Sequence, residues 1–321
     1  MKILVTAGGG FVGSSLLKSL RGVSTLDVKG LVRRKSAFSP RLMNITQIDD
    51  LINGLSLSFL SGFDLVIHNA ACVHQMKSVA DLAKYREENT VTTLNLARQA
   101  AAAGVKRFIF LSTIKVIGEE SPTGRPYSEE TVVNPQDAYA ISKYEAEQGL
   151  WDIARSTELD VVIIRLPLVY GPGVKANFLR MLQWADKGVL LPFGAIHNKR
   201  SLIGLENLND FILTCLTHPA AANQLFLVSD NHDLSTSELV GFLAGYLGRS
   251  SRQISLPPSI LSLLSLLLGK RDEFSRLCGS LQVDISKAKT LLGWEPPLTV
   301  AAGLQKTAEW YIENKRKGFR L

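Results

Sequence analysis

Short apolar runs alternate with helix-forming segments through the first half of the chain. Hydrophobic residues dominate residues 2–7, 28–34, 64–71, 106–113 and 161–171. Runs that are apolar at successive positions lack the alternation of a half-exposed sheet, so such strands are buried on both faces. Helical stretches separate them, the clearest at 10–20 and 89–104. This order predicts an α/β fold, a Rossmann-type doubly wound parallel sheet.

The pattern loosens after Gly171 into prolines, loops and helices. We expect residues 172–321 to form mainly a smaller C-terminal substrate-binding region, partly interleaved with the first. An apolar Ser/Leu segment at 256–270 is too short to span a bilayer, because about 20 apolar residues are needed. Serines recur in it every three residues, which favours a buried or interfacial helix, with contact to a membrane surface as the alternative.

Glycines 8, 10 and 13 stand where the first predicted strand turns into the first predicted helix. Such a turn lets the backbone approach a pyrophosphate, while the helix N-terminus supplies N–H donors and a positive dipole end. The alternative is a plain tight turn, but the strand before it and the helix after it favour a nucleotide site. We therefore interpret residues 1–171 as a dinucleotide-binding Rossmann domain.

Arg33 and Arg34 end the next predicted strand, where the adenosine ribose of a dinucleotide lies. An NAD site usually offers an acidic group to the 2′-hydroxyl at this point, whereas guanidinium groups match a 2′-phosphate. The pair favours NADP(H) as cofactor. NAD(H) is the alternative if the arginines are solvated and a neighbouring loop supplies an acid.

Composition narrows the class of protein. The 321 residues are 46% hydrophobic and 20% charged, which suits a globular protein, and we expect it to be cytoplasmic. The net charge is +7, but the basic residues are not interleaved with aromatic ones as in a nucleic-acid-binding module. The charge is therefore weak evidence for binding to DNA or RNA. Three scattered cysteines and five scattered histidines predict neither a disulfide framework nor a metal site.

A tyrosine and a lysine four residues apart, Tyr139 and Lys143, are the strongest candidates for chemistry. On a helix this spacing places both side chains on one face. Tyr311 and Lys315 repeat the spacing inside a charged C-terminal segment, where an ordinary helix surface is the natural interpretation. Context has to separate the two pairs.

Six motifs occur in order over the first 173 residues: TAGGGFVG, HNAA, the asparagine of ENTVTTLNL, FLSTIKVIG, YAISK and RLPLVYGPG. Together they resemble the extended short-chain dehydrogenase/reductases, in the nucleotide-sugar epimerase and reductase branch. Two positions depart from the family pattern. Ala7 replaces the first motif glycine, and Ile117 replaces a tyrosine.

The resemblance implies a set of site residues. Asn89 is implied as a structural or cofactor-side residue. The cofactor contacts implied by the resemblance are Gly8, Gly10, Phe11, Val12, Gly13, Asp50, Leu51, Ala70, Ala71, Lys143 and Pro167. The substrate contacts are His74, Thr113, Tyr139, Asn177 and Arg200, with a structural histidine and a solvated arginine as the alternatives for His74 and Arg200.

The predicted reaction depends on the phenol group of Tyr139 acting as a base. Free tyrosine has a pKa near 10, so it is a poor base at neutral pH unless positive charge stabilises the phenolate. Lys143 and a nicotinamide cation are expected to lower that pKa. Tyr139 then exchanges a proton with the C4 oxygen of a sugar, Thr113 holds that oxygen, and a hydride passes between C4 and the nicotinamide.

The predicted activity is oxidoreduction at C4 of a UDP-hexose in surface polysaccharide synthesis, either 4-keto reduction or 4-epimerisation. Because Arg33 and Arg34 favour NADPH, reduction is slightly preferred over epimerisation. Ile114 and Lys115 stand where sugar dehydratases of the family carry an Asp-Glu pair, which argues against dehydration. The resemblance also implies a homodimer. The alternative from another class is a non-catalytic dinucleotide-sensing protein of the same fold.

Overall fold

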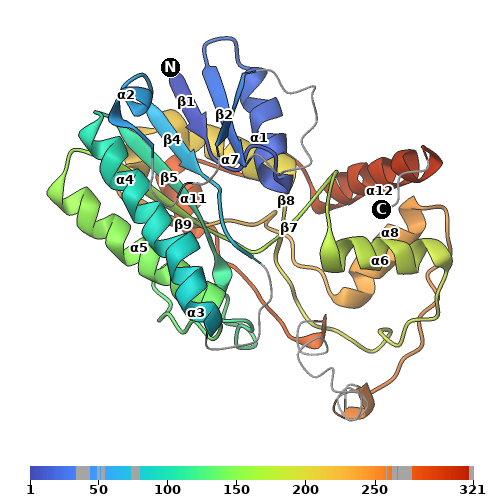
Figure 1. Ribbon diagram of the computed structural model, residues 1–321. Helices are drawn as coiled ribbons and strands as arrows, with labels where there is room; N and C mark the ends of the chain where they lie inside the picture. Colours follow the sequence, from blue (N-terminus) through green and yellow to red (C-terminus); the bar gives the residue numbers. More distant parts are fainter. Residues whose placement is uncertain are drawn as a thin grey trace.

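In the computed structural model, the described part of the chain forms one seven-stranded parallel sheet in the order β3–β2–β1–β4–β5–β6–β9 (Figure 1). The structure describes residues 1–33, 44–48, 51, 55–73, 80–257, 259–261, 266 and 277–317. The strands are β1 (Lys2–Val5), β2 (Asp27–Arg33), β3 (Ile45–Ile48), β4 (Leu65–His68), β5 (Arg107–Thr113), β6 (Asp160–Leu166) and β9 (Gln224–Leu227). The predicted Rossmann-type sheet is confirmed.

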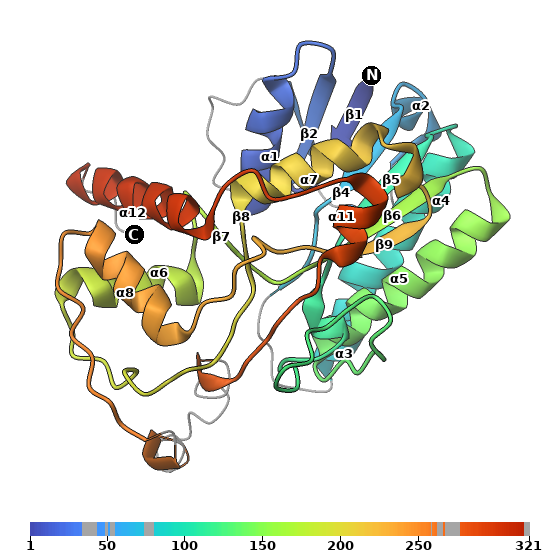
Figure 2. The same ribbon diagram turned by 180° about the vertical axis from the view of Figure 1, so that it is seen from behind.

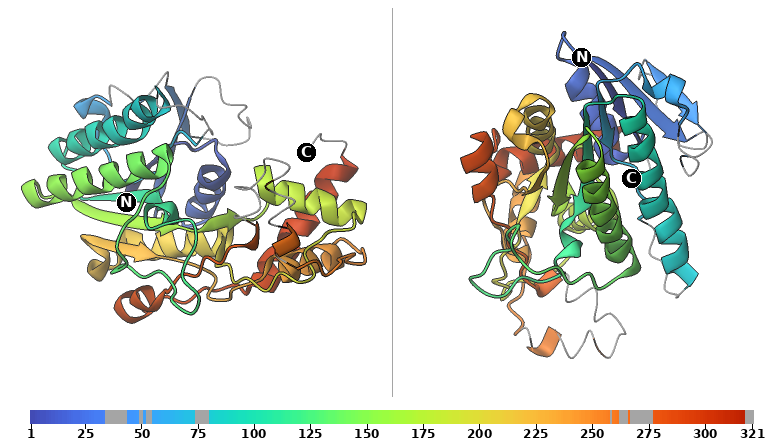
Figure 3. Two further views of the ribbon diagram at one scale, coloured as in Figure 1. Left: turned by 90° about the horizontal axis from the view of Figure 1, so that it is seen from below. Right: turned by 90° about the vertical axis from the view of Figure 1, so that its left-hand side faces the viewer.

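Helices cover both faces of this sheet (Figures 1 and 3). One face carries α1 (Phe11–Arg21), α7 (Leu205–Thr217) and α11 (Ser286–Leu292). The other carries α2 (Leu57–Leu60), α3 (Ala80–Tyr85), the π-helical turn η1 (Arg86–Val91), α4 (Thr92–Ala102) and α5 (Ala138–Ser156). Short 3-10 turns, η2 (Ile114–Val116) and η3 (Pro219–Ala221), follow β5 and α7.

The central strand β1 shows why its run is apolar throughout. Ile3 and Val5 pack in the cluster with α1 and α7, whereas Leu4 packs in the cluster with α4 and α5. All three side chains are fully buried. Because successive strand residues point to opposite faces, burial on both faces requires an apolar residue at every position.

A second lobe forms around a separate apolar cluster (Figure 2). It contains α6 (Ala176–Lys187), α8 (Thr236–Tyr246) and α12 (Val300–Arg316), beside a parallel pair of β7 (Leu168–Tyr170) and β8 (Leu202–Gly204). The elements α7, β9 and α11 lie in the second half of the chain but belong to the large sheet and its helices. The domain boundary at residues 171 and 172 stays a prediction.

Most of the Ser/Leu segment at 256–270 lies outside the described residues. In its described part Leu261 is buried, whereas Ile260 and Leu266 are exposed. No helix among the described residues is long and apolar enough to cross a membrane.

A buried ion pair fastens α5 to the sheet. Glu147 on α5 receives a 2.7 Å bond from Arg165 on β6 and a 2.5 Å bond from the Ser112 hydroxyl on β5. The two charged side chains are 0% and 5% exposed. Removing one partner of such a pair strands the other charge in a dry interior, which costs far more than loss of a surface pair.

We expect Arg165→Met to lower the free energy of unfolding by about 3–5 kcal/mol, because the Glu147 carboxylate keeps its burial and loses its cation. Urea-induced unfolding measures the change. Arg155→Met is the matched control, since Arg155 and Asp152 form an ion pair that is 70% and 73% exposed. Its loss should stay within about 0.5 kcal/mol. Equal losses for the two variants would contradict the anchoring role of the buried pair.

Candidate functional site

The predicted cofactor and catalytic segments meet at the carboxyl edge of the sheet. The glycine turn follows β1, Ala70 and Ala71 follow β4, and Thr113 ends β5. These three strands are neighbours in the parallel sheet, so their carboxyl ends lie side by side. Strand order also reverses between β1 and β4, which is where nucleotide sites form in such sheets.

The glycine turn is closely packed. A Cβ on Gly13 would lie 2.2 Å from the carbonyl oxygen of Ala7, so glycine is required there. Helix α1 begins at Phe11 and continues with Val12, after an extended Gly10. Within the described residues no side chain caps this N-terminus, so its first N–H groups are available to an anion. The turn therefore fits a dinucleotide pyrophosphate.

Ala7 adopts a left-handed backbone conformation with φ of 51°. This conformation crowds the Cβ of an L-residue and costs about 1–2 kcal/mol, whereas glycine adopts it freely. The family glycine at this position therefore has a conformational cause. In this chain the turn keeps its shape, since the Gly10 N–H still bonds to the Ala7 carbonyl at 2.9 Å.

A buried network fixes the glycine turn against the segment after β4. The Thr6 hydroxyl oxygen accepts the N–H groups of Asn69 and Ala70, each at 3.0 Å, and contacts Nδ1 of His68 at 3.0 Å. On the other side of the ring, Nε2 of His68 lies 3.0 Å from the Thr93 hydroxyl. Burial, with a smaller contribution from Lys143, lowers the pKa of His68 to about 3, so the ring is neutral.

The lysine of the YAISK motif is buried on α5. Lys143 is 1% exposed, and its Nζ lies 3.8 Å from the centroid of the Phe110 ring. Burial lowers the pKa of Lys143 to about 7, although the charge of Glu147 opposes the change. The lysine is therefore buried against Phe110 of β5, and its pKa lies close to neutral pH.

Tyr139 lies one turn nearer the start of α5 and is half-buried. Its ring packs edge-on against Tyr85 at a centroid distance of 6.2 Å. Burial, followed by the charges of Asp137 and Tyr85, raises the pKa of Tyr139 above its ordinary value. In the protein without dinucleotide, burial therefore outweighs any lowering of this pKa by Lys143, and the lowering expected from Lys143 together with a nicotinamide cation stays a prediction.

Thr113 is 9% exposed at the end of β5, and its hydroxyl oxygen accepts the backbone N–H of Lys115 at 3.3 Å. Contacts of α5 with β5 bring this hydroxyl to the Tyr139 end of the helix. Glu147 bonds Ser112, and Asp137, just before the helix, bonds Lys115 on the turn that follows Thr113. The elements that carry the three predicted catalytic residues thus pack against each other.

Asn89 lies in the π-helical turn η1, fully buried, and joins two parts of the site. It exchanges two hydrogen bonds with the backbone of Cys72 and donates a third to Ser142 on α5 at 3.0 Å. Ser142 in turn donates to the Tyr139 carbonyl at 2.8 Å. Of the two roles predicted for Asn89, structural or cofactor-side, these contacts favour the structural one.

For several predicted cofactor and substrate residues, the structure gives a position but no contact with the rest of the site. Leu51 is buried in the core cluster of the α4 and α5 face, and Pro167 separates β6 from β7. Asn177 is exposed in the first turn of α6. Arg33 ends β2, but its side chain, like all of Arg34, Asp50 and His74, lies outside the described residues.

Arg200 is half-buried and donates to the Gly279 carbonyl at 2.9 Å. Burial lowers its pKa despite the opposing charges of Glu120 and Glu119. Both glutamates follow the turn after Thr113, which brings Arg200 to the same side of the molecule as the catalytic strand end. A solvated loop arginine would lack this burial.

Sequence reasoning did not single out Glu147, Ser112 or Arg165. A signal existed for one of them, because Glu147 follows Lys143 by four residues and so shares its helix face. The second tyrosine–lysine pair lies in the other lobe, where Tyr311 and Lys315 both bond Asp186 on α6.

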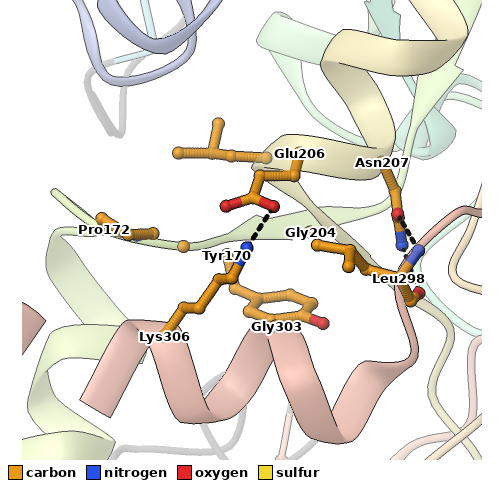
Figure 4. Close-up of a pocket in the computed structure, with 10 residues that line it drawn as sticks. Tyr170, Pro172, Gly204, Glu206, Asn207, Leu298, Gly303 and Lys306 are labelled. Carbon is orange, nitrogen blue, oxygen red and sulfur yellow. Dashed lines mark hydrogen bonds and ion pairs between the residues drawn. The ribbon is translucent and has the colours of Figure 1, made fainter. Parts of the chain in front are cut away.

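A small cavity of about 20 Å³ lies between β8, α7 and α12, with Tyr170, Asn207 and Gly303 in its wall and the Glu206–Lys306 ion pair at its rim (Figure 4). It holds about one water molecule. It is too small for a sugar nucleotide and is separate from the predicted site.

Comparisons with known proteins agree with this geometry. Residues 3–228 match the NAD dependent epimerase/dehydratase family. A UDP-glucose 4-epimerase of Vibrio cholerae is 45% identical over 97% of this chain and 95% of its own. An Escherichia coli O157:H7 4-epimerase of N-acetylglucosaminyl-diphospho-undecaprenol is 27% identical over 98% and 96%.

Solved structures share the fold. The UDP-glucuronic acid 4-epimerase of Bacillus cereus with NAD superposes with a TM-score of 0.79 at 22% identity, over 98% of this chain and 99% of its own. The UDP-glucose 4-epimerase of Thermotoga maritima with UDP-glucose gives 0.78 at 24% identity, over 98% and 100%.

We expect Gly13→Ala to weaken dinucleotide binding at least about tenfold, because its Cβ would push the Ala7 carbonyl out of the turn. Titration calorimetry measures the affinity. Gly62→Ala is the control, since nothing lies within 4 Å of its added Cβ. Wild-type affinity in the Gly13 variant would show that the turn does not carry the dinucleotide.

We expect Lys143→Met to stabilise the dinucleotide-free protein by about 1–3 kcal/mol at pH 6, since the folded state then buries no ammonium. Between the folded pKa of about 7 and the ordinary 10.5, the unfolded wild type binds one more proton than the folded form. Wild-type stability therefore rises with pH, and the gap between the proteins narrows. Urea unfolding at several pH values measures it. A constant gap, or a similar gain in Lys315→Met, would contradict the prediction.

Proposed function

The chain belongs to the NAD dependent epimerase/dehydratase family, and from that membership we propose that it is an enzyme that epimerises C4 of a UDP-hexose. The observation that carries the proposal is that Thr113 ends β5 and that Tyr139 and Lys143 lie on α5, which packs on β5, at the same sheet edge where the glycine turn follows β1. The Vibrio cholerae relative, a UDP-glucose 4-epimerase, supports the reaction type.

In the proposed reaction the Tyr139 phenolate takes the proton from the sugar O4, which the Thr113 hydroxyl holds in place. When bound at the glycine turn, the dinucleotide would accept the C4 hydrogen as a hydride and would later return it. After the 4-keto sugar presents its other face, Tyr139 returns the proton to O4. Lys143 orients the phenol and the nicotinamide ribose.

We assign the dinucleotide to the turn of Gly8, Gly10 and Gly13, the start of α1, and the segment of Ala70 and Ala71. Leu51 and Pro167 are proposed for its adenine and nicotinamide ends. Asn177 and Arg200 are proposed for the UDP moiety, with Arg200 on the diphosphate. Arg200 suits that anion because it is a half-buried cation near Glu119 and Glu120, on the segment that follows β5 and η2.

We propose NAD as the cofactor. The family is NAD dependent, and the Bacillus cereus structure contains NAD. The preference for NADP(H) predicted from Arg33 and Arg34 has no support in these comparisons. Those two arginines favour a second candidate, NADPH-dependent reduction of a 4-keto sugar.

The Escherichia coli relative acts on a sugar attached to a polyprenyl diphosphate. This supports a place in surface polysaccharide synthesis. Assembly into a homodimer through a helical face that includes α5, and a cytoplasmic location, remain proposals.

The two enzymatic candidates differ in their use of cofactor. An epimerase interconverts UDP-glucose and UDP-galactose without net consumption of dinucleotide, whereas a reductase consumes NADPH with a UDP-4-keto sugar. Chromatography of the UDP-sugars and the absorbance of reduced nicotinamide separate the outcomes. Binding of dinucleotide without turnover of any UDP-sugar would favour the sensing protein.

We expect Tyr139→Phe to lower kcat by roughly 10²–10⁴-fold, since the proton relay to O4 is lost. The loss should appear in kcat more than in KM, because the ring and its packing remain. Tyr311→Phe is the matched control, as it belongs to the other tyrosine–lysine pair, and should keep wild-type kcat. Full activity in the Tyr139 variant would remove this residue from the mechanism.

A further inference from the structure

Lys115 is fixed at both ends next to the proposed catalytic residues. Its backbone N–H donates to the Thr113 hydroxyl at 3.3 Å. Its ammonium donates to Asp137 at 2.7 Å and to Glu119 at 2.6 Å. One residue therefore contacts the side chain of Thr113 and, through its own side chain, the segment that begins α5.

Asp137 is the N-cap of α5. One carboxylate oxygen accepts the Ala140 N–H at 2.7 Å, while the other accepts Lys115. Tyr139 lies between the cap and Ala140, in the first turn of the helix. The position of Asp137 therefore sets where the tyrosine enters the site, and the ion pair with Lys115 ties that position to the end of β5.

The same pair has an electrostatic effect on the phenol. A carboxylate near a phenol disfavours the phenolate, and the charge of Asp137 contributes to the raised pKa of Tyr139. The ammonium of Lys115 lies against that carboxylate and offsets its charge. Burial lowers the pKa of Lys115, but its two carboxylate partners raise it overall, so the lysine stays protonated.

We propose that Lys115 is a positioning residue for catalysis, which holds Thr113 and Tyr139 in register and screens the Asp137 carboxylate from the phenol. This inference rests on the proposed function. Lys115 occupies one of the two positions after Thr113 where a dehydratase carries its acid–base pair. In this chain the Lys115 ammonium is bonded to Glu119 and to Asp137, the N-cap of α5.

The ion pair contributes little to overall stability, which separates its role from a structural one. The side chain of Lys115 is 30% exposed, and those of Glu119 and Asp137 are 34% and 40% exposed. Ion pairs this exposed to solvent contribute weakly to folding. Loss of the lysine should therefore change the proton affinity of Tyr139 more than the melting temperature.

Other titratable and charged groups face the same helix end and stay unchanged in the experiment. On the elements packed against the start of α5 they are Tyr85, the Lys84–Glu88 and Arg86–Glu145 pairs, Lys143 on the same helix, and Glu119 after η2.

The test is the pH profile of kcat for Lys115→Met. Without the ammonium, the uncompensated Asp137 raises the pKa of Tyr139, so the acidic limb should move up by about one pH unit and kcat at pH 7 should fall roughly tenfold. At pH values above the limb, kcat should approach the wild-type value. Lys115→Arg keeps the charge and should keep the limb near its wild-type position. The melting temperature should stay within about 3 °C of wild type.

The double variant Lys115→Met with Asp137→Asn provides the rescue. Asparagine still caps the helix but carries no charge, so the limb should return to within about 0.3 pH units of wild type. An unshifted limb in Lys115→Met overturns the proposal. So does an equal loss of kcat at every pH that the double variant fails to recover, because that result describes a purely structural lysine.

A second readout separates this inference from the proposed function. The ultraviolet absorbance of the phenolate is titrated in dinucleotide-bound protein, and each variant is compared with its own Tyr139→Phe counterpart. Inactivity of wild type on every UDP-sugar together with a shifted Tyr139 titration would reject the function and keep only the electrostatic coupling between Lys115 and Tyr139. Turnover of a UDP-sugar without a shift in that titration would keep the proposed function and reject the inference.

Discussion

The seating of α5 on the sheet is the constraint on which the candidate site depends. Glu147 is held by Arg165 and Ser112 in the interior, and Lys143 rests on the Phe110 ring one turn closer to the edge. Tyr139 follows after another turn, so the four-residue spacing places all three on one helix face. Because the deepest contact is a fully buried charge pair, the helix has little freedom to slide, and the tyrosine is delivered to the end of β5.

This arrangement sets the proton affinities as well as the positions. Burial favours the neutral forms of Lys143 and Tyr139: the pKa of Lys143 falls to about 7, and that of Tyr139 rises. The protein alone therefore holds a neutral phenol, which is a poor base. In the proposed reaction, positive charge from a bound, oxidised dinucleotide would add to the partial charge of Lys143 in stabilising the phenolate.

Much of this could be predicted from sequence, because the signals are local. Runs such as ILV in β1 reveal burial on both faces, and the glycine turn reveals a close backbone approach. The choice between the two tyrosine–lysine pairs also followed from neighbouring sequence. The Glu147–Arg165 pair could not be predicted, since spacing says nothing about which strand supplies the cation. The raised pKa of Tyr139 in the protein without dinucleotide could not be predicted, because the sequence shows the neighbouring lysine but not the burial of both groups.

The two lobes are connected by more than one linker, which bears on how substrate and cofactor meet. The chain leaves the large sheet after β6, returns at α7, leaves again after β9 and returns at α11. Arg200 lies at a junction of these passages, where its backbone bonds Leu234 and bridges to Leu281. A residue held by two returning segments keeps its place relative to both lobes. For the proposed diphosphate contact, this fixed position makes Arg200 better suited than the exposed Asn177.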